Sequence, residues 1–444
     1  MSNNKDVLDK VFGYVEENKI QFIYLWFSDV LGRLKSFSIT PKELDEAFNE
    51  GMGFDGSSIH GFARIDESDL IAKPDPKTFS LLPWQLKEHP VAKMFCDILK
   101  PDGEPYEGDP RYALKRCLNK INERNYTYNV GPELEFFYFK NDKNPEPIDN
   151  GGYFDLTTLD AGSDLRRDTI LTLEAMGIEV EYSHHEGAPS QHEIDLRYRD
   201  ALTMADIVMT YRVVVKEIAR QYGYYATFMP KPLIGVNGSS MHVHQSLFKN
   251  GKNVFFDSND VYHLSNTAKW YIAGLLKYAP EITSILNQWV NSYKRFVPGF
   301  EAPVYVSWAR RNQSTLIRVP IYKPGKEEST RIELRSPDPA CNPYLAFAVM
   351  LAAGLAGIKE KLELPLPIEE DIYCMNKSDL SDKGITVLPG SLIEAITLTE
   401  KSRLVHDVLG DHIFNKFIRS KKVEWDNYRT QVTEWELKKY LPIL

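Results

Sequence analysis

A length of 444 residues is more than one hydrophobic core usually holds, so two or more domains are expected. The apolar fraction of 43% is that of an ordinary globular protein, and a formal charge of −9 argues against a nucleic-acid-binding surface. No apolar run is long enough to span a membrane, and the N-terminal residues lack the apolar region of a signal peptide. The four cysteines form no CxxC pair, which favours reduced thiols in a cytoplasm.

The N-terminal part mixes short helices and strands. Residues 5–18 are predicted to form a helix, followed by the apolar strand IQFIYLWF. The stretch FDGSS around Asp55 is a loop, which glycine and serine turn chemistry alone would explain. A further strand, VAKMFCDIL, ends at PDGEPYEGDP, whose proline, glycine and acidic residues mark the best candidate for a domain boundary. We therefore predict domains over residues 1–104 and 105–444.

Beyond this boundary long helices alternate with strands. Asp109 and Pro110 begin the first helix, with the aspartate as N-cap and the proline at the first helical position. Helices are predicted near residues 110–124, 163–176, 200–221, 265–286 and 342–360. The strands between them are predicted at GPELEFFYF, within IEVEYSHHEGAPSQHEIDLR, and at SSMHVHQSLF and TRIELR. Residues from about 365 to the end are predicted to be mostly helical.

The strand GPELEFFYF carries two carboxylates on one face. Side chains alternate along a strand, so Glu133 and Glu135 lie on the same side, about 7 Å apart. Phe137 and Phe139 share that face, which indicates that it is at least partly buried. Buried carboxylates repel one another and lose hydration, so they need a cation. The alternative is an edge strand with both carboxylates in water.

Further acidic and imidazole side chains interrupt the other predicted strands. They are Glu186, Glu193, Glu333, His184, His185, His192, His242 and His244. A single histidine is more often a hydrogen-bonded core residue than a ligand, but a set dominated by carboxylate oxygen suits Mg²⁺ or Mn²⁺ better than a structural zinc. Two such cations would offset most of the charge of five glutamates.

Arginines are concentrated in one short region of this acidic chain. They are Arg295, Arg310, Arg311, Arg318, Arg331 and Arg335. A solvated charged face is the simpler explanation, but several of these arginines lie in strand-like contexts that would hold their guanidinium groups in place for phosphate or carboxylate oxygens. Divalent cations beside arginines favour phosphoryl transfer. No Walker loop or Rossmann glycine pattern is present in the sequence.

Taken together, these segments resemble type I glutamine synthetase of bacteria and archaea, in its shorter alpha subtype. The resemblance rests on FDGSSIHGF, GPELEFFYF, GGYFD, HHEGAPSQHE, FMPKPLIGVNGSSMHVHQSLF, VNSYKRFVPGFEAP, LIRVP and TRIELRSPDPACNPYLAF. It implies an α+β fold, with a small N-terminal β-grasp domain and a larger catalytic domain built on a curved antiparallel sheet with flanking helices. It also implies ATP-dependent joining of ammonia to L-glutamate through γ-glutamyl phosphate.

The resemblance also assigns roles to single residues. One metal ion would be held by Glu135, Glu186 and Glu193, and another by Glu133, His242 and Glu333. The residues that resemble nucleotide contacts are Glu181, His244, Ser246, Arg318 and Arg331. Those that resemble glutamate contacts are Asn237, Gly238, Arg295, Glu301 and Arg335. Glu301 resembles the residue of a flap that closes over the intermediate and keeps water away from the acyl phosphate.

The ammonium pocket of the family is shared between subunits. By resemblance, Asp55 and Ser58 reach into the site of a neighbouring subunit, where the aspartate takes a proton from ammonium. Tyr153 and Glu186 complete the pocket. The family forms two stacked six-membered rings, so activity would depend on assembly. Arg64 matches an arginine linked in the alpha subtype to feedback by glutamine.

Two positions depart from the family pattern. The chain has NQS where the family usually has NRS, so Gln313 replaces an arginine that faces the phosphate. Loss of such a donor costs about 2–4 kcal/mol, unless Arg310 or Arg311 supplies the charge. The chain also has NGSSMH where NGSGMH is usual. Ser240 therefore adds a Cβ that the backbone must accept, or else the substrate loop is altered.

Other functions remain open at this point. A γ-glutamyl-amine ligase would keep the chemistry and change the acceptor, but Asp55, Ser58 and Tyr153 argue against it. A catalytically weakened paralogue that binds glutamine or senses nitrogen status is favoured only by Gln313. A hydrolytic metalloenzyme is the least favoured, because the sequence contains no HExxH helix.

Overall fold

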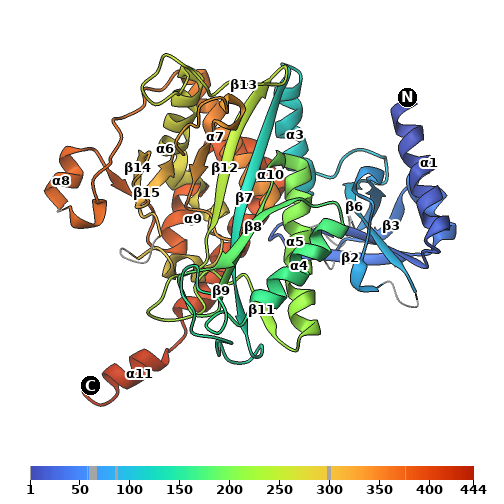
Figure 1. The fold of residues 1–444 in the computed structure, drawn as a ribbon, viewed down its shortest axis with the longest axis horizontal. Helices are drawn as coiled ribbons and strands as arrows, with labels where there is room; N and C mark the ends of the chain where they lie inside the picture. Colours follow the sequence, from blue (N-terminus) through green and yellow to red (C-terminus); the bar gives the residue numbers. More distant parts are fainter. Residues whose placement is uncertain (1, 58, 60–67, 86–88, 298–301, 376) are drawn as a thin grey trace.

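The computed structural model describes residues 2–57, 59, 68–85, 89–297, 302–375 and 377–444. It contains two sheets: a small one in the N-terminal part and a large one that carries most of the remaining strands (Figure 1). The mixture of helices and sheets, with the small sheet first, agrees with the predicted α+β class. Ser58, Arg64 and Glu301 lie outside the described residues.

The small sheet has the strand order β2-β1-β6-β4-β3, with β5 paired to β6. Strands β1 and β6 run parallel, and the other pairs are antiparallel. Its elements are α1 (Ser2–Glu17), β1 (Phe22–Ser28), β2 (Leu34–Ile39), α2 (Leu44–Asn49), β3 (Met52–Asp55), β4 (Asp69–Pro74), β5 (Ser80–Leu81) and β6 (Val91–Leu99).

The two faces of the small sheet serve two different cores. Leu25 and Met94 belong to the core of the N-terminal part. Their chain neighbours Trp26 and Phe95 instead belong to the large core of the molecule, and their rings meet edge to face with centroids 5.7 Å apart. Because successive side chains of a strand point to opposite faces, one sheet can close its own core and also pack against the rest of the chain.

The large sheet is organised around β7, a strand of 14 residues. The strand order is β17-β14-β15-β16-β12-β7-β9-β8, and the pairs are antiparallel except for β14 and β15. Its strands are β7 (Tyr126–Phe139), β8 (Val180–His185), β9 (Gln191–Leu196), β10 (Arg199–Asp200), β11 (Tyr225–Thr227), β12 (Met241–Lys249), β13 (Lys252–Asn253), β14 (Tyr305–Ala309), β15 (Thr315–Arg318), β16 (Ile332–Leu334) and β17 (Thr386–Val387).

The register of these strands brings acidic and imidazole side chains together. Glu135 of β7 lies opposite Glu193 of β9, and Glu133 lies opposite His242 of β12. His244, two residues further along β12, lies opposite Glu333 of β16. Because side chains repeat every second residue on one face, this register places all five strand positions of the predicted metal site in one area of the sheet.

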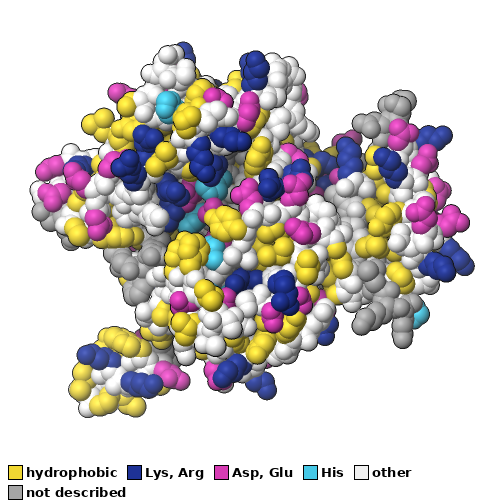
Figure 2. All heavy atoms as spheres, viewed as in Figure 1, with side chains coloured by type: hydrophobic (Ala, Val, Ile, Leu, Met, Phe, Trp, Pro, Cys, Tyr) yellow, Lys and Arg dark blue, Asp and Glu magenta, His cyan; other side chains and the backbone are white. Residues whose placement is uncertain are grey.

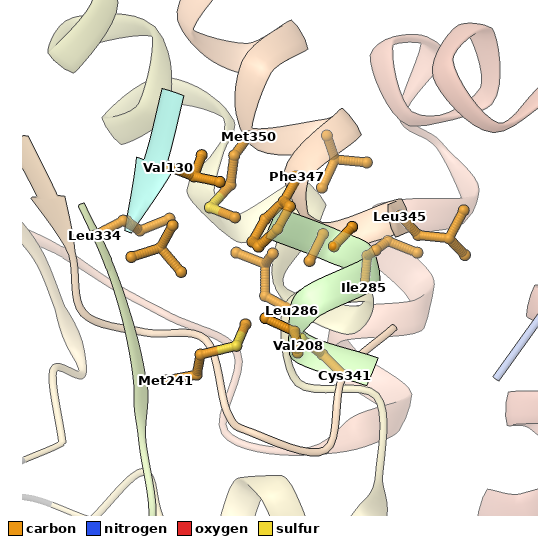
Figure 3. Packing of buried hydrophobic residues seen from close by; sticks show 14 of the residues in the cluster. Val130, Val208, Met241, Ile285, Leu286, Leu334, Cys341, Leu345, Phe347 and Met350 are labelled. Carbon is orange, nitrogen blue, oxygen red and sulfur yellow. The ribbon is translucent and has the colours of Figure 1, made fainter. Parts of the chain in front are cut away.

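Helices pack against the large sheet and form most of the core with it, although α11 buries no residue. The helices are α3 (Pro110–Asn122), α4 (Ser163–Ala175), α5 (Ala201–Gln221), α6 (Asn266–Leu286), α7 (Pro343–Glu360), α8 (Lys377–Asp382), α9 (Leu392–Glu400), α10 (Arg403–Arg429) and α11 (Glu434–Tyr440). In Figure 3, Met241 and Leu334 from the sheet face Phe347 and Met350 of α7. Helices α6 and α7 approach so closely that a Cβ on Gly274 would lie 2.2 Å from the carbonyl oxygen of Ala353.

Helix α7 differs from one expectation. By length and apolar composition it could cross a membrane, although no apolar run was expected to do so. However, 67% of it is buried inside the molecule between other elements, as in a core helix. Its charge-poor sequence is therefore explained by packing on all sides.

The predicted helices agree with the observed ones to within about three residues at each end. The Asp109 side chain accepts a hydrogen bond from the Arg111 amide, as expected of an N-cap. Neither α2 nor β14 was predicted as a separate element. Strand β6 ends at residue 99 and α3 begins at residue 110, while the domain boundary at 104 stays a prediction.

Candidate active site

A cavity of about 530 Å³ opens over strands β7, β9, β12 and β16. In Figure 2, histidine side chains lie at the bottom of a hollow near the middle of the face shown, with Lys and Arg side chains along its rim. The residues that line the cavity include all six predicted metal ligands: Glu133, Glu135, Glu186, Glu193, His242 and Glu333. Their roles as ligands stay a prediction.

One group of potential ligands consists of His184, Glu186 and Glu193. The Nε2 of His184 lies 3.2 Å from a Glu193 carboxylate oxygen, and its Nδ1 lies 3.4 Å from one of Glu186. Burial, followed by the charge of Glu186, raises the pKa of Glu135 well above its usual value. Burial and the neighbouring carboxylates do the same to the pKa of Glu193, and one of its oxygens is buried without a partner.

A second group consists of Glu133, His242 and Glu333. His242 Nδ1 lies 3.4 Å from Glu133 and 3.7 Å from Glu333, and its Nε2 is buried without a hydrogen-bond partner. Burial opposes ionisation of Glu133, but His244 and His242 hold its pKa well below the usual value. Glu333 accepts hydrogen bonds from Arg318 and Arg335.

These two groups fit divalent cations. Carboxylate oxygens predominate among the donors, an oxygen of Glu193 and a nitrogen of His242 have no partner, and the carboxylates of the first group face one another without a described arginine or lysine in ion-pair contact. Hard cations such as Mg²⁺ and Mn²⁺ favour such donor sets. The two groups are therefore possible cation sites, and the identity and number of the ions stay predictions.

A third group, Asp149, His185 and His192, is also close enough to suggest a metal. Here Arg166 donates a hydrogen bond of 2.7 Å to His192 Nδ1. A neutral imidazole that accepts at Nδ1 carries its proton on Nε2, and that nitrogen then cannot bind a metal. His185 lies 3.0 Å from Asp149, whose carboxylate also accepts from the amides of Ser190 and Ala161. This group is a hydrogen-bond network that holds the segment 149–162.

A smaller cavity of about 250 Å³ lies beside the first and shares Glu133 and Tyr182 with it. Four of the residues that resemble nucleotide contacts line this smaller cavity: Glu181, His244, Ser246 and Arg331. The Arg331 Nε donates to His244 Nδ1 over 3.2 Å. Arg318, the fifth, lines the larger cavity. The larger, acidic cavity is therefore distinct from the smaller cavity, which Arg331 lines.

The remaining predicted residues fall into three groups. Tyr153, Asn237, Gly238 and Arg335 line the larger cavity. Arg295 does not line it, because its guanidinium is buried behind Ser240. Asp55 is exposed at the end of β3, in the small sheet, and does not line the cavity of its own chain.

Gln191, Tyr182 and Asp195 at the site were not predicted, and His184 was predicted only as one of the imidazoles near the acids. Gln191 donates to Glu135 over 2.7 Å, and His184 bridges Glu186 and Glu193. Tyr182 is hydrogen-bonded to Asp195, whose own pKa is raised to about 7 by burial and then by Glu133. The alternation of QHEID on one strand could have indicated Asp195, whereas Gln191 gives no signal until the register is known.

Size alone does not identify the site. A cavity of about 750 Å³ lies between the turn after β1, helix α5 and the end of α10. Leu31, Met209 and Val213 contribute to its apolar wall, and no group of metal-binding side chains is found there among the described residues. The chemistry lies in the smaller, acidic cavity.

The fold and the site define an enzyme class. A small N-terminal domain stands beside a curved sheet whose strands bring carboxylates, imidazoles and guanidinium groups into one cavity, and this set of side chains suits enzymes that transfer phosphoryl groups with divalent cations. Comparisons with known proteins agree: residues 19–101 match the model of the glutamine synthetase beta-grasp domain, and residues 107–440 match that of the glutamine synthetase catalytic domain.

The chain belongs to the glutamine synthetase family, and it catalyses the ATP-dependent formation of glutamine from glutamate and ammonia. It is 52% identical to a glutamine synthetase of Mycolicibacterium smegmatis over 97% of this chain and 98% of the relative. It is 50% identical to one of Methanosarcina mazei over 100% of this chain and 98% of the relative.

Solved structures show the same fold. Plasmodium falciparum glutamine synthetase superposes with a TM-score of 0.88 at 25% identity, over 97% of this chain and 98% of that one. The GmaS/ADP complex superposes with a TM-score of 0.89 at 29% identity, over 97% and 99%.

Proposed function

We propose that the acidic cavity joins ammonia to L-glutamate through γ-glutamyl phosphate with two or more Mg²⁺ or Mn²⁺ ions. One would be held by Glu135, Glu186 and Glu193, and the other by Glu133, His242 and Glu333. Bound there, the ions would neutralise the acidic groups and polarise the phosphoryl oxygens. The observation that carries this proposal is the single cavity lined by all six side chains.

The substrates would lie in the two adjoining cavities. Glu181, His244, Ser246 and Arg331 would bind ATP in the smaller one, and its phosphates would extend past Glu133 toward Arg318. Glutamate would bind near Asn237, Gly238 and Arg335 in the larger one. Arg318 would then stabilise charge on the transferring phosphoryl group, and Glu301 would close the cavity against water.

The ammonium pocket would be completed by a second subunit. Tyr153 and Glu186 line the cavity, whereas Asp55 is exposed on the small sheet. An acid that takes a proton from ammonium must reach the cavity, so Asp55 of one subunit would serve its neighbour, together with Ser58. This supports a homo-oligomer with shared sites, and we propose two stacked six-membered rings.

Helix α11 supports further assembly. It projects away from the body of the molecule (Figure 1), and its segment exposes apolar side chains at Val432, Trp435, Leu437, Leu441, Ile443 and Leu444. Contiguous exposed apolar surface on a soluble protein marks a contact with another chain. Removal of residues 431–444 should reduce the mass measured by light scattering, and an unchanged mass would exclude α11 from the subunit contacts.

The test of the proposed function is ATP turnover with glutamate and Mg²⁺, in which ammonia is compared with small primary amines. Turnover with ammonia alone is the expected result. Turnover only with amines would favour a γ-glutamyl-amine ligase instead. Binding of glutamine without turnover would favour the nitrogen-sensing paralogue and overturn the proposal.

Gln313 lines the cavity beside Arg318, and neither Arg310 nor Arg311 does. We therefore expect that neither neighbour supplies the charge of the usual arginine. Gln313→Arg should raise kcat, since a guanidinium stabilises phosphoryl charge better than an amide. An unchanged kcat would show that the missing guanidinium does not limit the rate.

Location and regulation remain proposals of the same kind. All four cysteines are free thiols, which supports a reducing cytoplasm. Arg64 is proposed to take part in feedback by glutamine. Arg64→Ala should leave the rate without glutamine unchanged and weaken inhibition by added glutamine.

A further inference from the structure

Arg295 is a buried cation without a direct ion pair among the described residues. Its side chain is 1% exposed, and it forms no ion pair with any carboxylate in the described part of the chain. One amino group donates to Ser240 Oγ over 2.7 Å, and the other donates to Asn287 Oδ1 and to the carbonyl oxygen of Ser336. The Nε is buried without a hydrogen-bond partner. The carboxylates of Asp338 and Glu135 attract this guanidinium without touching it, and its hydrogen bonds all go to neutral acceptors. A further anion in closer contact would lower the cost of burying the charge.

Ser240 separates this guanidinium from the cavity. It is nearly buried, it lines the cavity, and its amide donates to Glu135 over 3.0 Å. Its backbone φ is not among the positive values, so the Cβ fits without strain. A Cβ on Gly238 would lie 3.1 Å from Arg295 Cγ, so the segment 237–240 packs directly on this arginine. Arg295 therefore reaches the cavity only through the serine.

The hydroxyl of Ser240 can still donate one hydrogen bond. Its oxygen accepts from Arg295, and its own proton has no acceptor in the described part of the chain. A hydroxyl that accepts from a cation becomes a better donor, since hydrogen bonds in a chain polarise one another. Ser240 lines the cavity in which glutamate is proposed to bind, and glutamate carries one carboxylate that reacts and one that does not.

We propose that Ser240 presents the charge of Arg295 to the non-reacting carboxylate of glutamate, accepting a hydrogen bond from the guanidinium and donating one to the substrate. The proposal rests on the proposed glutamate site. Ser240 is thus a specificity-determining contact where the family usually has a glycine, and Arg295 is a positioning residue that acts through it.

Three variants of the full-length protein separate the hydroxyl from the volume of the side chain. Ser240→Ala keeps the Cβ in front of Arg295 but removes the donor, so the Kd of L-glutamate should rise about 10- to 100-fold. Ser240→Gly removes the obstacle as well, so the guanidinium can approach the carboxylate itself and the Kd should stay within about threefold of the unsubstituted protein. Ser240→Thr retains the hydroxyl and should bind glutamate well.

The measurement is isothermal titration calorimetry with L-glutamate and MgCl₂, which needs no turnover. The competing ligand 4-aminobutyrate lacks the non-reacting carboxylate and should bind all variants alike. The KM for glutamate should follow the same order while the KM for ATP stays constant. Two results would overturn the role of Ser240. One is an equal rise in the Kd of L-glutamate for Ser240→Ala and Ser240→Gly, and the other is an unchanged Kd for Ser240→Ala. Failure of the unsubstituted protein to bind glutamate would instead overturn the proposed site, and this role with it.

Discussion

Two groups of buried and half-buried acids in this molecule are neutralised in different ways. Between the small sheet and the helices, Asp75, Asp97 and Asp206 surround Arg111, whose guanidinium bonds to all three. Lys115 adds a second cation to Asp97. In the acidic cavity, Glu135, Glu186 and Glu193 face one another with no described lysine or arginine in ion-pair contact.

The difference distinguishes structure from function. In the first group the cations are Arg111 and Lys115 of the chain itself. The ion pairs that they form connect the small sheet to the helices of the rest of the molecule. In the second the acids depend on cations from outside the chain, because burial and neighbouring carboxylates otherwise raise the pKa values of Glu135 and Glu193. Substitutions in the first group should therefore change stability, and those in the second should change metal binding and activity.

The largest effect is expected from Arg111→Met, which leaves three acids without their shared cation. The free energy of unfolding should fall by about 3–5 kcal/mol, the usual cost of breaking a buried ion pair from one side. Thermal unfolding measures this change. The matched control is Arg167→Met, which breaks an exposed pair with Asp164 and should cost less than about 1 kcal/mol. Equal effects of the two would show that burial of Arg111 is unimportant.

Glu135→Gln should instead lower the activity and leave the fold unchanged. It keeps the shape of the side chain and the hydrogen bond from the Ser240 amide but removes a proposed metal ligand. The value of kcat should fall about 10²- to 10³-fold. Circular dichroism should show an unchanged fold. Full activity of this variant would remove Glu135 from the metal site.

Metal binding itself should stabilise the protein. A ligand present at about 100 times its Kd adds about 2.7 kcal/mol to the free energy of unfolding. Titration with MgCl₂ or MnCl₂ should raise the unfolding temperature of the unsubstituted protein and of Arg111→Met, but much less that of Glu135→Gln. An identical rise in all three would mean that the ions bind elsewhere.

The smallest effect concerns Lys93, a buried lysine near the first group. It donates to the carbonyl oxygen of Thr78 and lies 4.6 Å from the ring of Phe95, but forms no ion pair in the described part of the chain. Burial lowers its pKa from 10.5 to about 8. Lys93→Met should therefore stabilise the protein by about 1–2 kcal/mol at pH 7, after allowance for the lost hydrogen bond.

Because the pKa of Lys93 is lowered in the folded state, the free energy of unfolding should depend on pH. Below pH 8 it is charged in both states, and its burial cost is constant. Between pH 8 and 10.5 the folded state has released the proton and the unfolded state has not, so stability rises with pH. Chemical unfolding at pH 7, 9 and 10 should show this rise, and Lys93→Met should lose it. A stability that falls equally in both proteins would contradict the assignment.

Sequence patterns were sufficient for the long helices and for the strands that carry the site, but not for the short helix α2. The periodicity of apolar residues and the Asp109–Pro110 cap depend on neighbours along the chain, so they can be read without a structure. The alternation in GPELEFFYF likewise predicted that Glu133 and Glu135 share a face, and both line the cavity. Strand β14 was missed because its pattern is short and its partners are distant in sequence.

Residue types and their alternation were determined by the sequence itself: acids and imidazoles on apolar strands, and arginines in one late segment. Only the tertiary structure decided which of them meet, because strand register sets Glu135 opposite Glu193 and Glu133 opposite His242. It also decided that His184 joins the acids, that Arg295 lies behind Ser240, and that Asp55 is remote from the cavity of its own chain. These relations depend on contacts between distant segments, which no local pattern contains.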